Sequence, residues 1–150
     1  MENAIFSLSS PAFGNGDKIP TKYTCKGSGL SPPLSIRNTP DEANSLALIV
    51  HDPDAPQGDF LHWTMWNISP NATDIDEDMP PVDAIEGKND FRQTGYNALC
   101  PPSGRHRYLF DLYALSEPLK LRLGANRFDV EEAISKIAIA KATLLGIVTA

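Results

Sequence analysis

The order of apolar and polar residues predicts strands along most of this chain. Residues 45–51 form a continuous apolar run of strand length, which is typical of a central strand covered on both faces. Residues 61–68 and 105–115 are similarly apolar and favour two more long strands. Thirteen prolines and ten glycines interrupt the chain, and they bound shorter strand candidates at residues 4–8, 19–25, 34–37 and 143–149.

Side chains on a strand alternate between its two faces, so the long strands also predict which residues lie together. Along residues 61–68, one face carries His62, Thr64, Trp66 and Ile68, and the other carries Leu61, Trp63, Met65 and Asn67. Along residues 105–115, one face carries His106, Tyr108, Phe110 and Leu112. This last face therefore begins with polar side chains and continues with apolar side chains that are expected in the core.

One segment predicts a helix. Asp129 is a suitable N-cap residue, and Glu132 follows it by three positions as in a capping box. Apolar residues then recur with helical spacing at Val130, Ala133, Ile134, Ile137 and Ala138. Many short strands with one late helix indicate a mainly β fold, either an all-β sandwich or a β-rich α+β domain. The 150 residues show no linker or repeat, so we expect a single domain over residues 1–150.

All three histidines lie in two short, proline-marked segments. Residues 50–67 contain His51 and His62 with both tryptophans and several acids, and residues 100–108, CPPSGRHRY, contain His106. Histidine titrates near neutrality and is a frequent partner of anions and metals. The clustering predicts one pocket built from two loops.

The pocket residues suit an anion. If His62 and His106 face one cavity, their ring N–H groups can donate to it, beside backbone amides exposed by the loops. Tyr108 shares a strand face with His106 and adds a hydroxyl donor. Asp52 can accept a hydrogen bond from one histidine and fix its tautomer. A phosphate or carboxylate head group fits this donor set.

Two enzymatic alternatives remain open. His51, Asp52, His62 and His106 contain the residue types of a metal site, although their spacing matches no short ligand motif such as HExxH. A hydrolase using the same cavity needs a nucleophile, and the sequence has no G-x-S-x-G elbow. Asp52 and Asp54 can be paired as carboxylates, but the prolines around them favour a structural role.

Charge and hydropathy restrict the partners. The formal net charge is −6 and the pI about 4.9, which argues against a nucleic-acid partner bound through its phosphates. No run approaches the roughly 20 apolar residues of a membrane span, and the first residues lack the basic region of a signal peptide. We therefore expect a cytoplasmic protein without integral membrane association. Cys25 and Cys100 have no CxxC spacing, and the sequence leaves a disulfide between them open.

Two separated motifs resemble the signatures of the phosphatidylethanolamine-binding protein family, which includes the Raf kinase inhibitor proteins. The first is DPDAP at residues 52–56, followed by His62, Trp63 and Asn67. The second is PPSG at residues 101–104, followed by residues 106–108 and 113–115. Further similarity to the bacterial and archaeal branch occurs at residues 23–27, 31–34, 95–96 and 143–146. The resemblance covers nearly the whole chain.

The resemblance implies a β-sandwich with one or two short helices near the C-terminus and a preformed anion pocket. The pocket residues would be Asp52, His62, Pro101, His106 and Tyr108, supported by Asp54, Pro56 and Pro102. Asp54 would brace the first loop, and one X-Pro bond there would be cis. Family members are similar in binding phosphorylated head groups and in inhibiting kinases or serine proteases. We therefore expect a non-enzymatic protein without cofactor or metal, whose protein partner is a kinase or serine protease, with homodimerisation left open.

Overall fold

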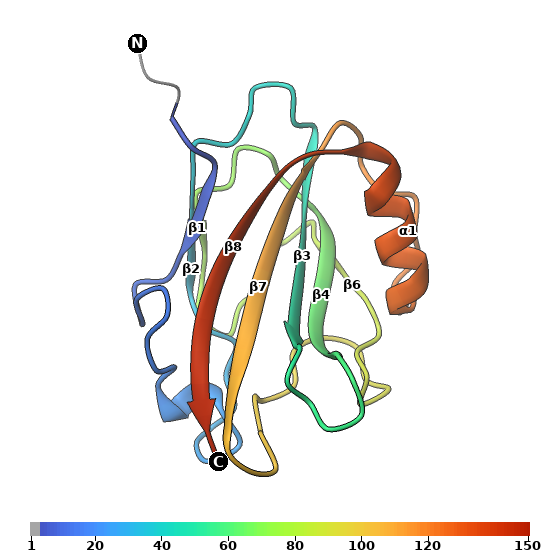
Figure 1. Cartoon of the computed structure of the whole chain (residues 1–150). Coiled ribbons are helices and arrows are strands. Elements are labelled where there is room, and N and C mark those ends of the chain that lie inside the picture. Colours follow the sequence, from blue (N-terminus) through green and yellow to red (C-terminus); the bar gives the residue numbers. More distant parts are fainter. Residues whose placement is uncertain (1–3) are drawn as a thin grey trace.

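The computed structural model describes residues 4–150, which fold into two antiparallel sheets (Figure 1). The smaller sheet has the order β1-β2-β5, with β1 at Ser7–Ser9, β2 at Leu34–Arg37 and β5 at Asp74–Ile75. The larger sheet has the order β6-β4-β3-β7-β8. Its strands are β3 (Ser45–Asp52), β4 (Phe60–Ile68), β6 (Ile85–Glu86), β7 (Arg105–Leu115) and β8 (Ala138–Thr149). The 3₁₀ helix η1 is Thr21–Tyr23, and the α-helix α1 is Arg127–Ile137.

The larger sheet is covered on both faces. The main core lies between the two sheets, where Leu48 and Val50 of β3 pack with Leu34 and Ile36 of β2. A second core lies on the opposite face, under α1, and contains Ala47, Ile49, Val130 and Ile134. Figure 1 shows α1 and the smaller sheet on opposite sides of the larger sheet. The predicted sandwich and the central, doubly covered strand are therefore confirmed.

Strand β4 does not alternate as predicted, because it contains two bulges. Val50 pairs with Trp63 but His51 pairs with Leu61, which leaves His62 as one extra residue on β4. A second irregularity lies near Asn67, whose φ is 58°. Each extra residue moves the side chains that follow it to the opposite face of the sheet. Trp63, Met65 and Ile68 consequently enter the main core, whereas Leu61 and Trp66 pack under α1. The prediction that Trp63 and Met65 share one face and Trp66 takes the other is confirmed, but Leu61 and Ile68 were predicted on the wrong faces.

The predicted face of β7 is confirmed at Tyr108, Phe110 and Leu112, which all enter the main core. This strand pairs with β3 on one side and with β8 on the other, and the ladder with β8 runs from Arg105↔Thr149 to Leu115↔Ala138. From Arg105 to Ala114 neither ladder of β7 has a register shift, so the alternation of its side chains follows its local sequence.

The helix begins and ends earlier than predicted. Asn126, not Asp129, is the N-cap residue, and its side chain accepts a hydrogen bond from the Asp129 N–H at 2.9 Å. At the other end, Ala138 is already the first residue of β8. Strand β8 is thus twelve residues long instead of the predicted seven, because the β7 ladder continues up to the helix.

The N-terminal strand candidates also differ from the structure. The first strand is displaced to Ser7–Ser9. Residues 19–25 form η1 between two isolated bridges at Lys18 and Thr24 instead of a strand. Pro20 precedes this turn and lacks the N–H that a sheet ladder requires. Among residues 4–150, no helix is long and apolar enough to span a membrane.

Candidate functional site

Three of the predicted residues meet at one end of the larger sheet. Asp52 ends β3, His62 lies near the start of β4, and His106 is the second residue of β7. Antiparallel pairing brings the end of β3 beside the starts of its two neighbours. All three side chains are buried, with 3%, 3% and 7% exposure respectively.

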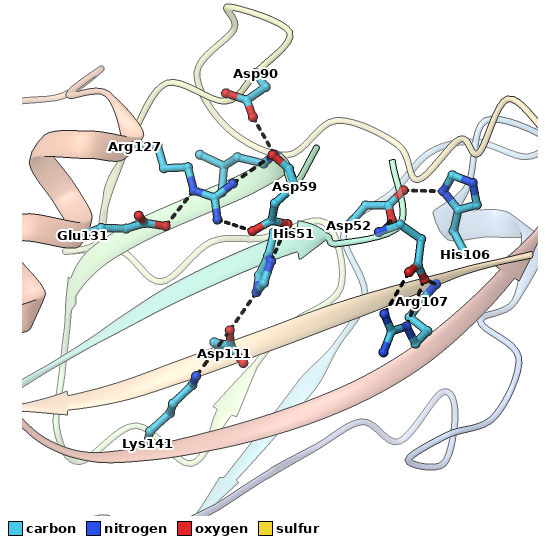
Figure 2. A network of polar contacts seen from close by, with 12 residues as sticks. His51, Asp52, Asp59, Asp90, His106, Arg107, Asp111, Arg127, Glu131 and Lys141 are labelled. Atoms are coloured by element: carbon cyan, nitrogen blue, oxygen red, sulfur yellow. Dashed lines mark hydrogen bonds and ion pairs between the residues drawn. The ribbon is translucent and has the colours of Figure 1, made fainter. Parts of the chain in front are cut away.

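Asp52 orients His106 and the loop after β3. Nδ1 of His106 donates to Oδ2 of Asp52 at 2.6 Å (Figure 2), and the Asp54 N–H donates to Oδ1 of Asp52 at 2.8 Å. Both carboxylate oxygens are therefore engaged. Because Nδ1 of His106 faces a carboxylate, it carries a proton, and Nε2 is the nitrogen left to meet a ligand.

Asp54 joins the same loop to β7. Its carboxylate accepts hydrogen bonds from Nε of Arg107 at 3.0 Å and from Nη2 at 2.8 Å, and also from the Arg107 backbone N–H at 2.9 Å. These bonds hold the pKa of Asp54 well below its ordinary value. Asp54 thus braces the loop that follows β3.

The His62 ring lies in an aromatic cage. Its centroid is 5.2 Å from Phe60, 5.4 Å from Phe91 and 5.4 Å from Tyr108. Nδ1 of His62 lies 3.2 Å from the Asn97 carbonyl oxygen, to which it donates. Burial lowers the pKa of His62, and this outweighs the opposing effect of the Asn97 carbonyl. His62 is accordingly neutral at pH 7 when the site is empty.

Tyr108 has a hydroxyl group without a partner. The side chain is fully buried, and its hydroxyl has no partner at hydrogen-bond geometry within the described part of the chain, although the Asp52 carboxylate is near enough to affect its pKa. Burial raises the pKa of Tyr108, and the nearby Asp52 charge raises it further. The tyrosine is therefore a neutral hydroxyl. A buried polar group without a partner costs free energy, and native structures rarely tolerate one.

A recess of about 580 Å³ opens at this end of the sheet, which is within the size range of small-molecule sites. Its lining residues are Asp52, Ala55, Pro56, Gln57, Gly58, Asp59, Phe60, His62, Asp90, Phe91, Cys100 and Pro102. Four of the residues predicted for the site therefore line it. The other four, Asp54, Pro101, His106 and Tyr108, are not lining residues. Asp54 and His106 contact the lining residue Asp52, Tyr108 contacts the lining residue His62, and Pro101 lies between the lining residues Cys100 and Pro102 in the sequence.

Sequence reasoning missed the aromatic part of the wall. Phe60 is two residues before His62, so its place near the site was accessible from the strand pattern. Phe91 and Asp90 lie in the irregular segment after β6, where no periodicity indicates a position. Asp90 accepts a hydrogen bond from the Leu61 N–H at 2.7 Å, which fixes this segment against β4.

The loop between β3 and β4 differs from one prediction. All peptide bonds between residues 4 and 150 are trans, so the expected cis X-Pro bond was wrong. The loop turns instead with Gly58, whose φ is 110° and whose N–H donates to the Ala55 carbonyl at 3.1 Å. The Asp52 carboxylate supplies the other constraint by accepting from the Asp54 N–H.

His51 does not join the pocket. It alternates with Asp52 on β3 and therefore points to the opposite face of the sheet, where its ring contacts Asp59 and Asp111. The expectation that all three histidines share one pocket was wrong. The metal-ligand set that included His51 is divided between two faces. Among residues 4–150, no three potential ligands of the His, Cys, Asp and Glu types converge on one point.

A disulfide links Cys25, after η1, to Cys100 on the wall of the recess, across 75 positions of sequence. The Cys25 N–H also donates to the Leu99 carbonyl at 3.2 Å. The loop that carries Pro101 and Pro102 is thereby tied to the N-terminal part of the chain. The sequence had left this bond open.

Comparison with known proteins agrees with the fold. The family model for phosphatidylethanolamine-binding protein matches residues 9–149. A UPF0098 protein of Methanothermobacter thermautotrophicus is 44% identical over 94% of this chain and 97% of its own length. The structure of a phosphatidylethanolamine-binding protein homologue from Chlamydia trachomatis superposes with a TM-score of 0.94, 40% identity and 99% coverage of both chains. Escherichia coli YbcL superposes with a TM-score of 0.91 and 29% identity, covering 98% of this chain and 99% of its own. This chain belongs to the phosphatidylethanolamine-binding protein family.

Proposed function

We propose that this protein is a non-enzymatic binding protein whose recess takes a small anion, a phosphate or carboxylate head group. The observation that carries the proposal is the buried Tyr108 hydroxyl, which has no partner at hydrogen-bond geometry among the described residues and whose ring contacts His62 on the wall of the recess. A phosphate or carboxylate oxygen would supply the missing acceptor. Nε2 of His106 and Nε2 of His62 are the other side-chain atoms that remain to meet a ligand.

Binding of an anion would draw a proton to His62. Burial lowers the pKa of His62, so that the ring by itself is neutral at pH 7. An anion beside the ring stabilises the imidazolium and raises its pKa. His62 would then donate from both nitrogens, to Asn97 and to the anion. Asp52 stays engaged with its own donors, His106 and the Asp54 N–H.

Two carboxylates among the lining residues of the recess suit a head group that also carries a positive charge. Asp90 and Asp59 line the recess. Asp59 is neutralised by Arg127 at 2.6 Å, whereas Asp90 accepts its only described side-chain hydrogen bond from a backbone N–H. The Asp90 carboxylate is thus available to an ammonium group. Phosphoryl-ethanolamine combines both charges in one small molecule.

We further propose that the occupied protein regulates a partner, a kinase or serine protease, and does not turn over its ligand. Support comes from family membership and from the absence of a nucleophile motif in the sequence. Inhibition assays against representative kinases and serine proteases test this step. Inhibition that persists in the His62→Ala/His106→Ala double variant would show that the pocket is not part of the inhibitory mechanism.

Isothermal calorimetry with inorganic phosphate and with phosphoryl-ethanolamine tests the anion site directly. The protein is first dialysed free of phosphate, sulfate and acetate. We expect 1:1 binding of both ligands, and tighter binding of phosphoryl-ethanolamine if Asp90 contacts the ammonium group. Absence of heat with both ligands, at two temperatures to exclude a zero enthalpy, would contradict the proposal.

A further inference from the structure

A second polar cluster lies on the face of the sheet opposite Asp52, and His51 is at its centre (Figure 2). Nδ1 of His51 lies 2.7 Å from Oδ1 of Asp59, and Nε2 lies 2.8 Å from Oδ2 of Asp111. The His51 side chain is 12% exposed and that of Asp111 is 7% exposed. The ring is thus held between two carboxylates in a largely dehydrated place.

This geometry requires the doubly protonated ring. A carboxylate oxygen only accepts hydrogen bonds, and a neutral imidazole has one donor nitrogen and one acceptor nitrogen. A neutral His51 would therefore direct a lone pair at one of its two carboxylates. Burial by itself lowers the pKa of His51, but the hydrogen bonds and charges of Asp111 and Asp59 outweigh it, so the pKa is raised.

The charges around the ring balance only in that state. Two carboxylates contact it, Asp59 from the loop before β4 and Asp111 from β7, and Glu131 of α1 joins the cluster through Arg127. The cations are Arg127 on α1 and Lys141 on β8, whose Nζ lies 3.8 Å from Asp111. Thr143 donates a hydroxyl to Asp111 at 2.8 Å, and the pKa of Tyr113 is raised by burial, so it adds no charge. With His51 as an imidazolium, the cluster has three cations and three carboxylates.

The cluster reaches the recess through Asp59. This residue is next to Gly58, and both line the recess. Its carboxylate is held by His51 on one oxygen and by Nη2 of Arg127 at 2.6 Å on the other. Residues 55–59 form the outer wall of the recess, and Asp59 ties the β4 end of that wall to the sheet and to α1. Figure 2 shows this chain of contacts from Glu131 through Arg127, Asp59 and His51 to Asp111.

We infer that His51 is a positioning residue: acting through Asp59 from the far side of the sheet, it holds the outer wall of the anion recess in place only as an imidazolium. The claim that His51 affects ligand affinity rests on the proposed function. The claim that His51 holds residues 55–59 in place does not. Because the pKa of His51 is higher in the folded chain than in the unfolded chain, its stabilising effect is complete at acidic pH. The effect is lost as the pH rises through the folded-state value.

Hydrogen exchange by NMR tests the wall in the ligand-free protein. The reporter is the Gly58 amide, which donates to the Ala55 carbonyl, and the reference is the Asp54 amide, which donates to the Asp52 carboxylate. Protection factors, corrected for intrinsic exchange, are measured while the His51 ring signals report its own titration. We expect Gly58 protection to fall several-fold as His51 deprotonates, with Asp54 unchanged. Constant Gly58 protection across the His51 titration would overturn the inference.

Two variants complete the test. Asp59→Asn removes, at a half-exposed position, the carboxylate charge that His51 and Arg127 both contact, so we expect low Gly58 protection at every pH and a fold that remains intact. Glu132→Gln is the matched control, because Glu132 pairs with Lys136 on α1 at 3.6 Å and with no other cation among residues 4–150. It should behave as the unmodified chain. Wild-type Gly58 protection in Asp59→Asn would also overturn the inference.

Phosphate titrations on the same proteins separate this inference from the proposed function. If the wild-type chain binds phosphate, affinity should be weaker in Asp59→Asn than in Glu132→Gln. Equal affinity in the two variants would refute the positioning of the anion site by His51. If the wild-type chain binds no phosphate while Gly58 protection follows His51, the proposed function fails and the wall mechanism stands.

Discussion

Nδ1 of His106 donates to Oδ2 of Asp52 at 2.6 Å, across 54 positions of sequence. Both side chains are buried, and each belongs to a different long strand of the larger sheet. The pair fixes which nitrogen of His106 remains available. It also anchors the loop after β3, because the other oxygen of Asp52 accepts from the Asp54 N–H. One carboxylate therefore organises both loops of the recess.

Removing that carboxylate should destabilise the fold. Asp52→Ala leaves the buried His106 and the Asp54 N–H without partners, and we expect the free energy of unfolding to fall by about 3 kcal/mol. Urea unfolding followed by tryptophan fluorescence measures it. The control is Asp54→Ala, whose partner Arg107 is largely exposed, so that the loss should be clearly smaller. Equal losses would refute the central role of Asp52.

Tyr108→Phe should separate binding from stability. It removes a hydroxyl that has no partner in the empty site, so the free energy of unfolding should stay constant or rise by up to about 1 kcal/mol. Phosphate affinity should fall roughly tenfold, because a hydrogen bond to a charged ligand is lost. Tyr113→Phe, on the opposite face, is the control. A loss of stability in Tyr108→Phe would show that the hydroxyl is already satisfied.

Phosphate affinity should weaken as the pH rises. The pKa of His62 is lowered in the empty pocket by burial, and a bound anion raises it, so binding takes up a proton between the two values. Calorimetry at one pH in two buffers of different ionisation enthalpy measures this uptake. An apparent enthalpy that does not depend on the buffer would show that a neutral His62 binds the anion.

The lowered pKa of His62 also affects the stability of the fold, which should increase as the pH rises. The folded chain holds fewer protons on His62 than the unfolded chain, so this group favours folding above the ordinary histidine value. The effect is lost as the pH falls from that value through the lower folded-state pKa. Without ligand, His62→Phe should reduce the acid sensitivity of the unfolding midpoint. With saturating phosphate, the unmodified chain should show reduced acid sensitivity as well.

The Cys25–Cys100 disulfide should contribute to stability by restricting the unfolded chain. The bond spans 75 positions, and closing a loop of this length is expected to stabilise the fold by about 4 kcal/mol. The Cys25→Ser/Cys100→Ser variant should lower the urea midpoint by the corresponding amount, and a reducing agent should have no further effect on it. Ellman titration of the denatured, unreduced wild-type chain should find no thiol; two thiols would contradict the bond.

Local sequence determined the parts of this protein that have simple periodicity. The apolar run at residues 45–51 indicated a strand covered on both faces, and β7 alternates as its residues predict. The ladder between these two strands has no register shift from Ser45↔Leu115 to His51↔Leu109. The two proline-marked motifs likewise indicated that Asp52, His62 and His106 belong to one region, and strand pairing places them together.

Only the tertiary structure determined the direction in which several side chains point. The bulge at His62 depends on how β4 pairs with β3, and no residue of β4 alone indicates it. His51 is next to Asp52 on β3, and adjacent side chains of a strand point to opposite faces, so His51 joins a different cluster. Phe91 reaches the recess from an irregular segment, and the Cys25–Cys100 bond closes a long loop. Period and propensity are properties of neighbouring residues, whereas register, bulges and loop contacts are set by partners that are distant in the chain.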